Sequence, residues 1–348
     1  MAYTTIDDPS EYFHTQIYTG DGNDDRSITN DANAGNFSPD WLWLKNRSGT
    51  NSHALVDTTR GATKVLRSNA SNAEETEANG IQAFETDGFQ IGSGGLVNTN
   101  GNNYVTWQWK ANGGTTSSNT DGSITTTVQA NTTAGFSIVT YTGSGSAGSF
   151  GHGLTSPKII IIKDRDDSNS WYFHTTAIDG SDDYVFLDQT TAKSNASAGY
   201  SIGTSVYNMG GAGSVTNLSG TDYVAYCFQE IKGYSKFSSY TGNGNADGAF
   251  VYTGFRPAFV IGKKTSGADN WYLMDTKRLP FNSSDGDRVF PNLSNAESTD
   301  GPRIDFVSNG FKIKTAAGLF NDSGATYIYM AFAEHPFVSS KGVPVTAR

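Results

Sequence analysis

Carboxylates are the side chains of this sequence that come closest to a catalytic pattern. Glu74, Glu75 and Glu77 stand close together in a segment rich in Asn, Ala and Ser. A glycoside hydrolase needs two carboxylates that flank the scissile bond, and a β-sandwich enzyme of this kind usually carries them on one strand with period-2 spacing. The segment around Glu74 is typical of a loop instead. Polysaccharide hydrolysis is therefore only a third hypothesis, and we assign no catalytic residue.

Acidic loops suggest calcium binding as a second kind of chemistry, because oxygen-rich loops can hold this ion. The loops fall at different places along the chain, however, and none has the twelve-residue calcium-loop pattern. Asp and Asn also favour turns on their own account. We expect solvated turns and no bound metal. The residues concerned are Asp21, Asn23, Asp24 and Asp25, then Asp164, Asp166 and Asp167, and finally Asp285 and Asp287.

A glycine-rich stretch, Gly143–Gly148, matches the dinucleotide-binding pattern G-x-G-x-x-G after an expected strand. That pattern also needs a helix whose N-terminus holds the pyrophosphate. Here the chain continues through Pro157 into another expected strand. The stretch is therefore predicted to be a turn, and no cofactor is expected.

Histidine and cysteine show no catalytic or metal-binding spacing. The pattern H-E-x-x-H is absent, and so is the nucleophile elbow G-x-S-x-G. Cys227 is the single cysteine, which excludes an intrachain disulfide, and its apolar surroundings predict a buried strand residue. The sequence therefore indicates a protein that is not an enzyme. The histidines are His14, His53, His152, His174 and His335.

Composition indicates an all-β protein. Of the 348 residues, 36% are hydrophobic and 17% are charged, and short runs of β-branched and aromatic residues alternate with Gly, Asn, Asp and Ser. The net charge of −10, without a Lys/Arg cluster, argues against nucleic acid as a partner. No run approaches 18 apolar residues, and Met1–Asp8 does not resemble a signal peptide, so neither membrane insertion nor secretion is expected.

Five sequence elements recur three times in the same order. Each copy has a Tyr-Thr-Gly-x-Gly turn, a Pro that opens an apolar strand, a second strand fourteen residues after the Pro, a Gly-aromatic-x-Ile element and a long closing strand. A Lys stands six residues after each Pro, and we expect it to mark where the strand re-emerges into water. The elements begin at Tyr18, Pro39, His53, Gly88 and Tyr104, at Tyr141, Pro157, Trp171, Gly199 and Tyr223, and at Tyr240, Pro257, Trp271, Gly310 and Tyr327; the lysines are Lys45, Lys163 and Lys263.

The third copy predicts about eight strands in roughly 100 residues, which suits a jelly-roll or concanavalin-like sandwich of two antiparallel sheets. Hairpins with two-residue turns are expected at Asp87-Gly88 and Asn309-Gly310, because these dipeptides favour the positive φ that strand twist requires. The expected strands are Lys236–Tyr240, Ala249–Thr253, Pro257–Lys263, Asn270–Asp275, Asp287–Phe290, Arg303–Val307, Phe311–Lys314 and Thr326–Ala333.

The repeat predicts three tandem antiparallel β-sandwich modules, each with its own hydrophobic interior. We expect a rigid contact between modules two and three, where the chain has almost no slack, and a looser joint after module one, where residues rich in Gly, Ser, Thr and Asn intervene. The expected division is an N-terminal docking segment at 1–14, modules at 15–112, 133–234 and 235–338, a linker or extra hairpin at 113–132 and a C-terminal tail at 339–348.

Four stretches of the sequence resemble a repeat protein common in marine tailed phages, whose members are labelled tail fibre proteins or virion proteins of unknown role. The resemblance covers nearly the whole chain. It implies a particle component with lectin-like sandwich modules, made in the host cytoplasm, and it brings no catalytic residues with it. The stretches are Ala2–Ile6, Ser123–Val128 with Thr133–Gly143, Tyr223–Phe228 and Ala325–Phe337.

Two roles follow from this resemblance. The first is an adhesin, associated with a tail fibre or spike, that contacts a glycan or a protein receptor on the host surface; repeated weak sites on one particle would gain avidity. The second is a capsid or tail decoration protein with a purely structural role, which the absence of a heptad stalk favours. In both roles the partners are other virion proteins and further copies of the chain within the particle. The sequence assigns no ligand-binding residue.

Overall fold

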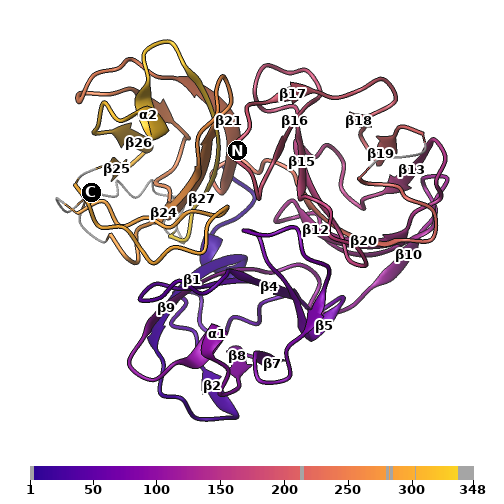
Figure 1. Ribbon diagram of the computed structural model, residues 1–348, viewed down its shortest axis with the longest axis horizontal. Coiled ribbons are helices and arrows are strands. Elements are labelled where there is room, and N and C mark those ends of the chain that lie inside the picture. The colour runs from indigo at the N-terminus through magenta and orange to yellow at the C-terminus, as the bar shows by residue number, and fades with distance from the viewer. Residues whose placement is uncertain (1–3, 212–214, 280–281, 283–284, 302, 336–348) are drawn as a thin grey trace.

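The computed structural model describes residues 4–211, 215–279, 282, 285–301 and 303–335. These residues form three large antiparallel sheets and three smaller three-stranded ones, arranged around a common centre (Figure 1). Apart from the short helices η1 (Pro9–Glu11), α1 (Gly95–Asn98) and α2 (Gly318–Asn321), the named elements are strands. The prediction of an all-β protein is confirmed.

The three large sheets share one order of four strands. In the first, this order is β1 (Phe13–Thr19), β9 (Asn103–Trp109), β3 (Trp41–Asn46) and β4 (Ala54–Asp57), followed by β5 (Gly61–Leu66) and β6 (Glu75–Thr76). In the second, it is β12 (Phe136–Thr142), β20 (Asp222–Phe228), β14 (Ile159–Asp164) and β15 (Tyr172–Thr175), with β10 (Ser117–Asn119) and β11 (Thr126–Asn131) on one side and β16 (Asp183–Phe186) and β17 (Ser194–Asn195) on the other. In the third, it is β21 (Ser235–Thr241), β27 (Thr326–Phe332), β23 (Phe259–Lys264) and β24 (Trp271–Asp275).

A three-stranded sheet faces each large one, which gives a sandwich-like pair of layers. The small sheets are β2 (Arg26–Ile28), β8 (Gly88–Ile91) and β7 (Ile81–Glu85); β13 (Gly148–Gly151), β19 (Val206–Met209) and β18 (Ser201–Ile202); and β22 (Phe250–Tyr252), β26 (Gly310–Ile313) and β25 (Ile304–Val307). We call the three pairs of sheets unit 1 (13–111), unit 2 (117–230) and unit 3 (235–334). The extra hairpin expected in the intervening segment exists as β11 paired with β12, and it belongs to the sheet of unit 2.

Each unit buries one face of its large sheet against its own small sheet, and apolar side chains alternate along the strands accordingly. Leu42 and Phe89 belong to this interior in unit 1 and Val260 and Phe311 in unit 3. Where each first strand meets its closing strand, two tyrosine rings stack almost parallel with centroids about 5 Å apart. The pairs are Tyr18–Tyr104 at 5.0 Å, Tyr141–Tyr223 at 5.0 Å and Tyr240–Tyr327 at 4.9 Å.

The opposite faces of the large sheets meet in one shared core. Trp109, Phe228 and Phe332 occupy equivalent positions on the three closing strands, and their ring centroids lie 5.6–6.4 Å from one another. Each unit thus has an interior of its own, as expected, and one further cluster of buried residues, which the sequence did not predict, draws on all three units. Unit 1 contributes to this core as well, since Trp41 stacks on Tyr226 of unit 2 with ring centroids 4.4 Å apart.

Several finer predictions need correction. Lys45, Lys163 and Lys263 do not re-emerge into water but are fully buried, because each Nζ donates to backbone carbonyls. The two hairpins exist, but the pairs Glu85–Gly88 and Val307–Gly310 place each glycine in the strand after the turn.

The described residues of unit 3 form seven strands, because the expected strand Asp287–Phe290 makes only isolated bridges at Arg288 and Val289. The expected docking segment at 1–14 overlaps β1, and Phe13 is buried in the shared core. Residues 1–3 and the tail at 339–348 lie outside the described residues.

Candidate functional site

The contacts between units determine which charged side chains have a structural role. At the boundary between units 1 and 2, the fully buried Arg60 side chain lies 2.6 Å from Asp57 and 2.8 Å from Glu74. The hydroxyl of Tyr226, from unit 2, donates to the same Asp57 carboxylate at 2.8 Å. Burial disfavours the Arg60 charge, but Asp57, Tyr226 and Glu74 together outweigh burial and raise the pKa of Arg60 above its ordinary value.

The boundary between units 3 and 1 repeats this arrangement. Arg278 lies 2.6 Å from Asp275 and also pairs with Glu297, and the indole Nε1 of Trp107, from unit 1, donates to Asp275 at 3.0 Å. Arg47 of unit 1 then binds Glu297, as Arg165 of unit 2 binds Glu74.

The boundary between units 2 and 3 lacks the buried Asp–Arg pair and its hydrogen-bond donor. Thr175 and Ile178 replace the Asp and the Arg, and Met330 replaces the tyrosine or tryptophan. The main-chain contact is nevertheless kept, since Lys193 N donates to Thr265 O just as Glu74 N donates to Arg165 O. The three units therefore contact head to tail, in the order 1–2–3–1, and the ring closes within one chain.

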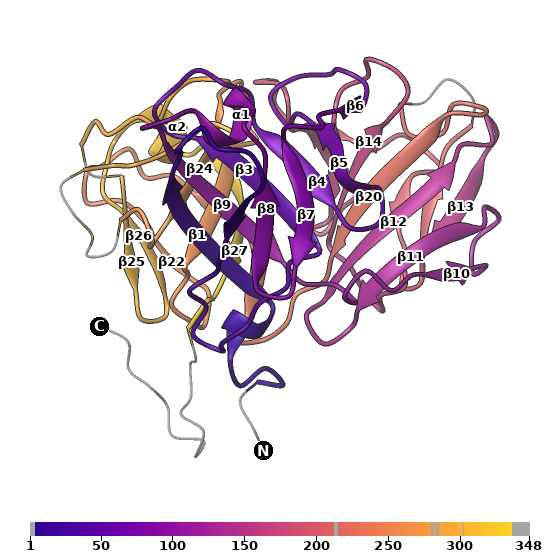
Figure 2. The same cartoon turned by 90° about the horizontal axis from the view of Figure 1, so that it is seen from below.

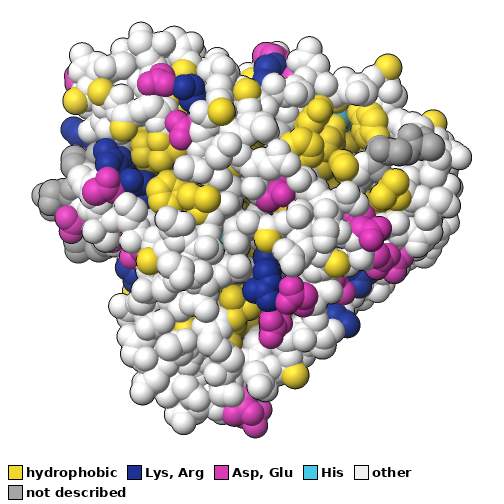
Figure 3. Space-filling model, viewed as in Figure 1, with side chains coloured by type: hydrophobic (Ala, Val, Ile, Leu, Met, Phe, Trp, Pro, Cys, Tyr) yellow, Lys and Arg dark blue, Asp and Glu magenta, His cyan; other side chains and the backbone are white. Residues whose placement is uncertain are grey.

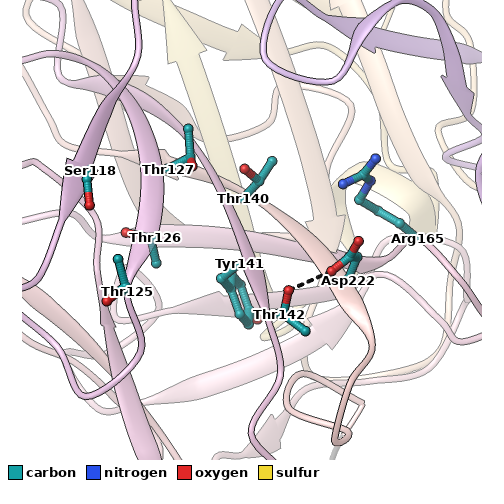
Figure 4. A pocket seen from close by; sticks show the side chains of 9 residues that line it. All are labelled: Ser118, Thr125, Thr126, Thr127, Thr140, Tyr141, Thr142, Arg165 and Asp222. Carbon is teal, nitrogen blue, oxygen red and sulfur yellow. Dashed lines mark hydrogen bonds between the residues drawn. The ribbon is translucent and has the colours of Figure 1, made fainter.

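An open polar groove lies beside the boundary between units 1 and 2, on the large sheet of unit 2. Its volume is about 260 Å³. Hydroxyl groups dominate its surface, and Figure 4 shows them side by side with Arg165 and Asp222. The lining residues are Ser118, Thr125, Thr126, Thr127, Thr140, Tyr141, Thr142, Arg165 and Asp222.

Sheet register accounts for the hydroxyl row. Ser118, Thr127 and Thr140 are cross-strand partners on β10, β11 and β12, so their side chains lie on one face of the sheet. Thr142 donates to the Asp222 carboxylate at 2.7 Å across the next pair of strands. The repeat alone does not predict this row, because β10 and β11 have no counterparts among the described residues of units 1 and 3.

The charges at the groove are constrained by their partners. Both Nε and Nη2 of Arg165 donate to the Glu74 carboxylate, at 3.0 and 2.9 Å. Burial alone would raise the pKa of Glu74, but the hydrogen bond from Arg165 and the charge of Arg60 outweigh burial and lower this pKa. Asp222 is the one carboxylate among the described lining residues. The groove can therefore hydrogen-bond a polar ligand, whereas it does not present the carboxylate pair that glycoside hydrolysis uses.

The other carboxylates of the hydrolase hypothesis also have partners. Glu75 and Glu77 both lie against Arg67, at 2.7 and 3.0 Å. The three glutamates thus stabilise the edge of unit 1 and its boundary with unit 2.

The acidic side chains at Asp21 and Asp164 cap turns of their own backbone, but Asp164 is buried at the end of β14 and not solvated as expected. Asp164 accepts from the backbone N–H groups of Asp166 and Asp167, and Asp21 accepts from Asn23 N. Within the described part of the chain, no group of three or more His, Cys, Asp or Glu side chains could hold a metal ion.

The Gly143–Gly148 stretch leads from β12 into β13 and not into a helix, as the sequence predicts. A buried amide holds it, because Asn217 Oδ1 accepts from Ser144 N. Asn98 and Asn321 hold the equivalent loops of units 1 and 3 in the same way.

The histidines do not form a common site. His53 is fully buried, with Nδ1 accepting from Trp43 and Nε2 donating to Phe290 O of unit 3, and burial lowers its pKa to about 3. His152 and His174 are also buried, and their pKa values fall to about 4 for the same reason. His14 lies between Glu334 and Asp31, and His335 is exposed. Cys227 is buried as expected, and burial raises its pKa to about 12.

The fold and the groove define a β-sandwich-like protein with an open polar groove on one of its large sheets. Residues 8–336 match the model of the family described as "Domain of unknown function (DUF7483)", and the chain belongs to this family. Neither a curated protein nor a solved structure matches the chain. Among the described residues, no helix is long and apolar enough to span a membrane.

Proposed function

We propose that this chain is a virion protein of a tailed phage and acts as a non-catalytic adhesin, associated with a tail fibre or spike, that contacts the host surface. The observation that carries the proposal is the position of the groove relative to the ends of the described chain. The last described residues lie beside the start of β1, where His14 contacts Glu334 at 2.7 Å. In unit 2 the equivalent strand is β12, and Thr142 lies at its far end, about 20 Å from Phe136 at the usual rise per residue.

This polarity suits a particle-bound binding protein. An attachment near the chain ends leaves the hydroxyl groove and the loops around α1 and α2 directed away from the particle. Figure 2 shows α1 and α2 together at one edge of the molecule. On the face drawn in Figure 3, charged side chains lie in small scattered groups among uncharged ones, which suits recognition through hydrogen bonds more than through charge.

Adsorption of the phage to its host cells tests this function. Purified protein added in excess should slow adsorption, because it occupies the host receptor. Replacing the hydroxyls of Thr127 and Thr142 by Val should weaken this competition at least tenfold if the groove contacts the receptor. The matched control is Thr19→Val, which removes an exposed hydroxyl at the position of unit 1 equivalent to Thr142. Wild-type protein that does not affect adsorption would contradict the adhesin role.

A structural decoration protein is the second candidate, and ring closure is the observation that favours it. Three interfaces closed within one chain give a rigid body without a stalk, as a clamp on a capsid or tail would require. Electron microscopy of particles labelled with an antibody to this chain separates the two roles: label confined to the head shell supports decoration, and label at the fibre or spike supports the adhesin.

A further inference from the structure

Two exposed aromatic side chains distinguish unit 3 from the other units. Phe250 and Tyr252 retain 49% and 61% of their surface, and they are the exposed large hydrophobic residues of the described chain. The residue between them, Val251, is buried in the interior of unit 3. The two rings therefore lie on the outer face of β22, the edge strand of its sheet, two residues and roughly 7 Å apart.

The equivalent positions of the other units carry small side chains. Val251 pairs with Phe311, as Ile28 pairs with Phe89 and Phe150 with Tyr207. The structural equivalent of Phe89 in unit 2 is therefore Tyr207 of β19 and not Tyr200, which corrects the sequence alignment of the Gly-aromatic-x-Ile element. By this register, Ser27 and Thr29 replace the two aromatic residues in unit 1, and Ser149 and Gly151 replace them in unit 2. The sandwich therefore does not require the rings, because the same strand forms without them.

The surroundings of the rings combine a bare patch of backbone with fixed polar groups. Tyr252 pairs with Gly310, and a ring carbon of Phe250 would lie 3.1 Å from a Cβ placed on this glycine, so the Phe250 ring reaches over it. Lys312 is the cross-strand partner of Phe250, and its Nζ donates to Gly248 O at 2.6 Å.

Both charge signs are present beside the rings. Lys312 Nζ also lies 2.8 Å from Asp247, and Asp305 follows Lys312 on the same face of the next strand. Hydrogen-bond donors and acceptors therefore stand within one short row of the sheet, on the three strands that Figure 2 shows at the left side of the molecule.

We propose that Phe250 and Tyr252 form a platform for a neutral sugar residue of a surface polysaccharide. This inference rests on the adhesin function and names its ligand class. A pyranose has an apolar C–H face that stacks on an aromatic ring and hydroxyls that both donate and accept, as Lys312, Asp247 and Asp305 require. An anionic ligand would meet the two carboxylates.

The size of the platform also favours a sugar over a protein. Two half-exposed rings offer about 200 Å², since a fully buried aromatic residue covers 150–250 Å². A stable protein interface needs about 800 Å² from each partner. The platform matches one or two sugar rings instead, and the weak affinity of such a contact is compensated when several copies act on one particle.

The test uses the full chain and an array of bacterial surface polysaccharides, with cellohexaose, laminarihexaose and chitohexaose as soluble probes in saturation-transfer NMR. The variant Phe250→Ser with Tyr252→Thr copies unit 1 and should fold normally, which its thermal unfolding checks. We expect the wild type to bind at least one of these carbohydrates and the variant to lose at least tenfold in affinity. The matched control, Ser27→Ala with Thr29→Ala, changes the equivalent exposed positions of unit 1 and should bind as the wild type does.

Two outcomes would overturn the platform: equal binding by the wild type and the aromatic variant, or no carbohydrate bound by the wild type. The adsorption assay separates these from failure of the adhesin function. Protein that slows adsorption but binds no carbohydrate leaves the adhesin in place with a different ligand. Protein that binds sugar through the two rings, but is found only on the head shell, supports the platform and contradicts the tail role.

Discussion

The hydroxyl of Tyr226 in unit 2 donates a 2.8 Å hydrogen bond to the buried carboxylate of Asp57 in unit 1. Trp107 makes the same contact with Asp275 at the boundary between units 3 and 1. At the remaining boundary, the residue equivalent to Tyr226 is Met330, and the residue equivalent to Asp57 is Thr175. A side chain that donates to the carboxylate is thus present where the carboxylate is present and absent where it is absent. The two sides of each boundary are therefore complementary to each other.

This matching predicts how the ionic boundary responds to substitution. Arg60→Met should lower the free energy of unfolding by about 3–5 kcal/mol, because it leaves buried carboxylates without their cation. The triple variant Asp57→Thr, Arg60→Ile and Tyr226→Met gives this boundary the residues found between units 2 and 3. Its free energy of unfolding should fall by less than about 1 kcal/mol, or rise, because no buried charge is left without a partner. Urea unfolding of both variants checks this, and a triple variant as unstable as Arg60→Met would refute the equivalence of the boundaries.

The shared core predicts that an isolated unit does not fold. A fragment of residues 235–335 would expose Phe259 and Phe332, which are buried against units 1 and 2 in the whole chain. We expect this fragment to lack near-ultraviolet circular dichroism and dispersed amide resonances. Adding the separately produced fragment 1–234 should restore both signals. A fragment that folds alone would show that the interior of unit 3 is sufficient.

Buried histidines predict a loss of stability below neutral pH. The pKa values of His53, His152 and His174 lie at about 3, 4 and 4 in the folded chain, well below the ordinary value of 6.5. Between pH 6.5 and 4, the unfolded chain therefore binds protons that the folded chain does not, and the free energy of unfolding falls as the pH falls.

Each of these histidines can contribute up to about 1.4 kcal/mol per pH unit in this window. Urea unfolding at pH 6.5, 6.0, 5.5 and 5.0 measures the slope, before the carboxylates titrate. The variant His53→Gln keeps a hydrogen-bonding side chain that does not titrate, and its slope should be smaller by as much as one such contribution. An unchanged slope would contradict the assignment of His53.

A steric prediction concerns Gly88, which follows the first hairpin turn. Its φ is +111°, and a Cβ there would stand 1.9 Å from Ile28 O of the neighbouring strand. Gly88→Ala should therefore lower the free energy of unfolding by about 4 kcal/mol or more. Gly101→Ala is the matched control, because Gly101 also has a positive φ, +80°, but no atom within 4 Å; its cost should be about 1 kcal/mol. If both variants lose a similar free energy of unfolding, the backbone of Ile28 does not approach Gly88 as closely as described.

The sequence alone predicted the strands well, because their signals are local. Alternating apolar residues, prolines at strand starts and Gly turns predict seven of the eight expected strands of unit 3 to within about two residues. The same turns place Phe84–Glu85 and Phe306–Val307 in hairpins. Local signals also predicted that the glycine-rich and acidic loops are turns.

Tertiary structure decided what the second face of each large sheet contacts. An apolar face is equally compatible with an interior of its own and with a shared one, and only the ring placed Trp109, Phe228 and Phe332 together. Burial of Lys45 was unpredictable for a related reason, since its partners are backbone carbonyls of a loop that folds over it.

The candidate sites depend on tertiary structure even more strongly. Exposure of Phe250 and Tyr252 follows from the edge position of β22, and the hydroxyl groove follows from the pairing of β10 and β11 onto β12. A sequence specifies which side chains alternate along a strand, because that period is local. Which of the two faces remains in contact with water is decided by the sheets and units that pack against it.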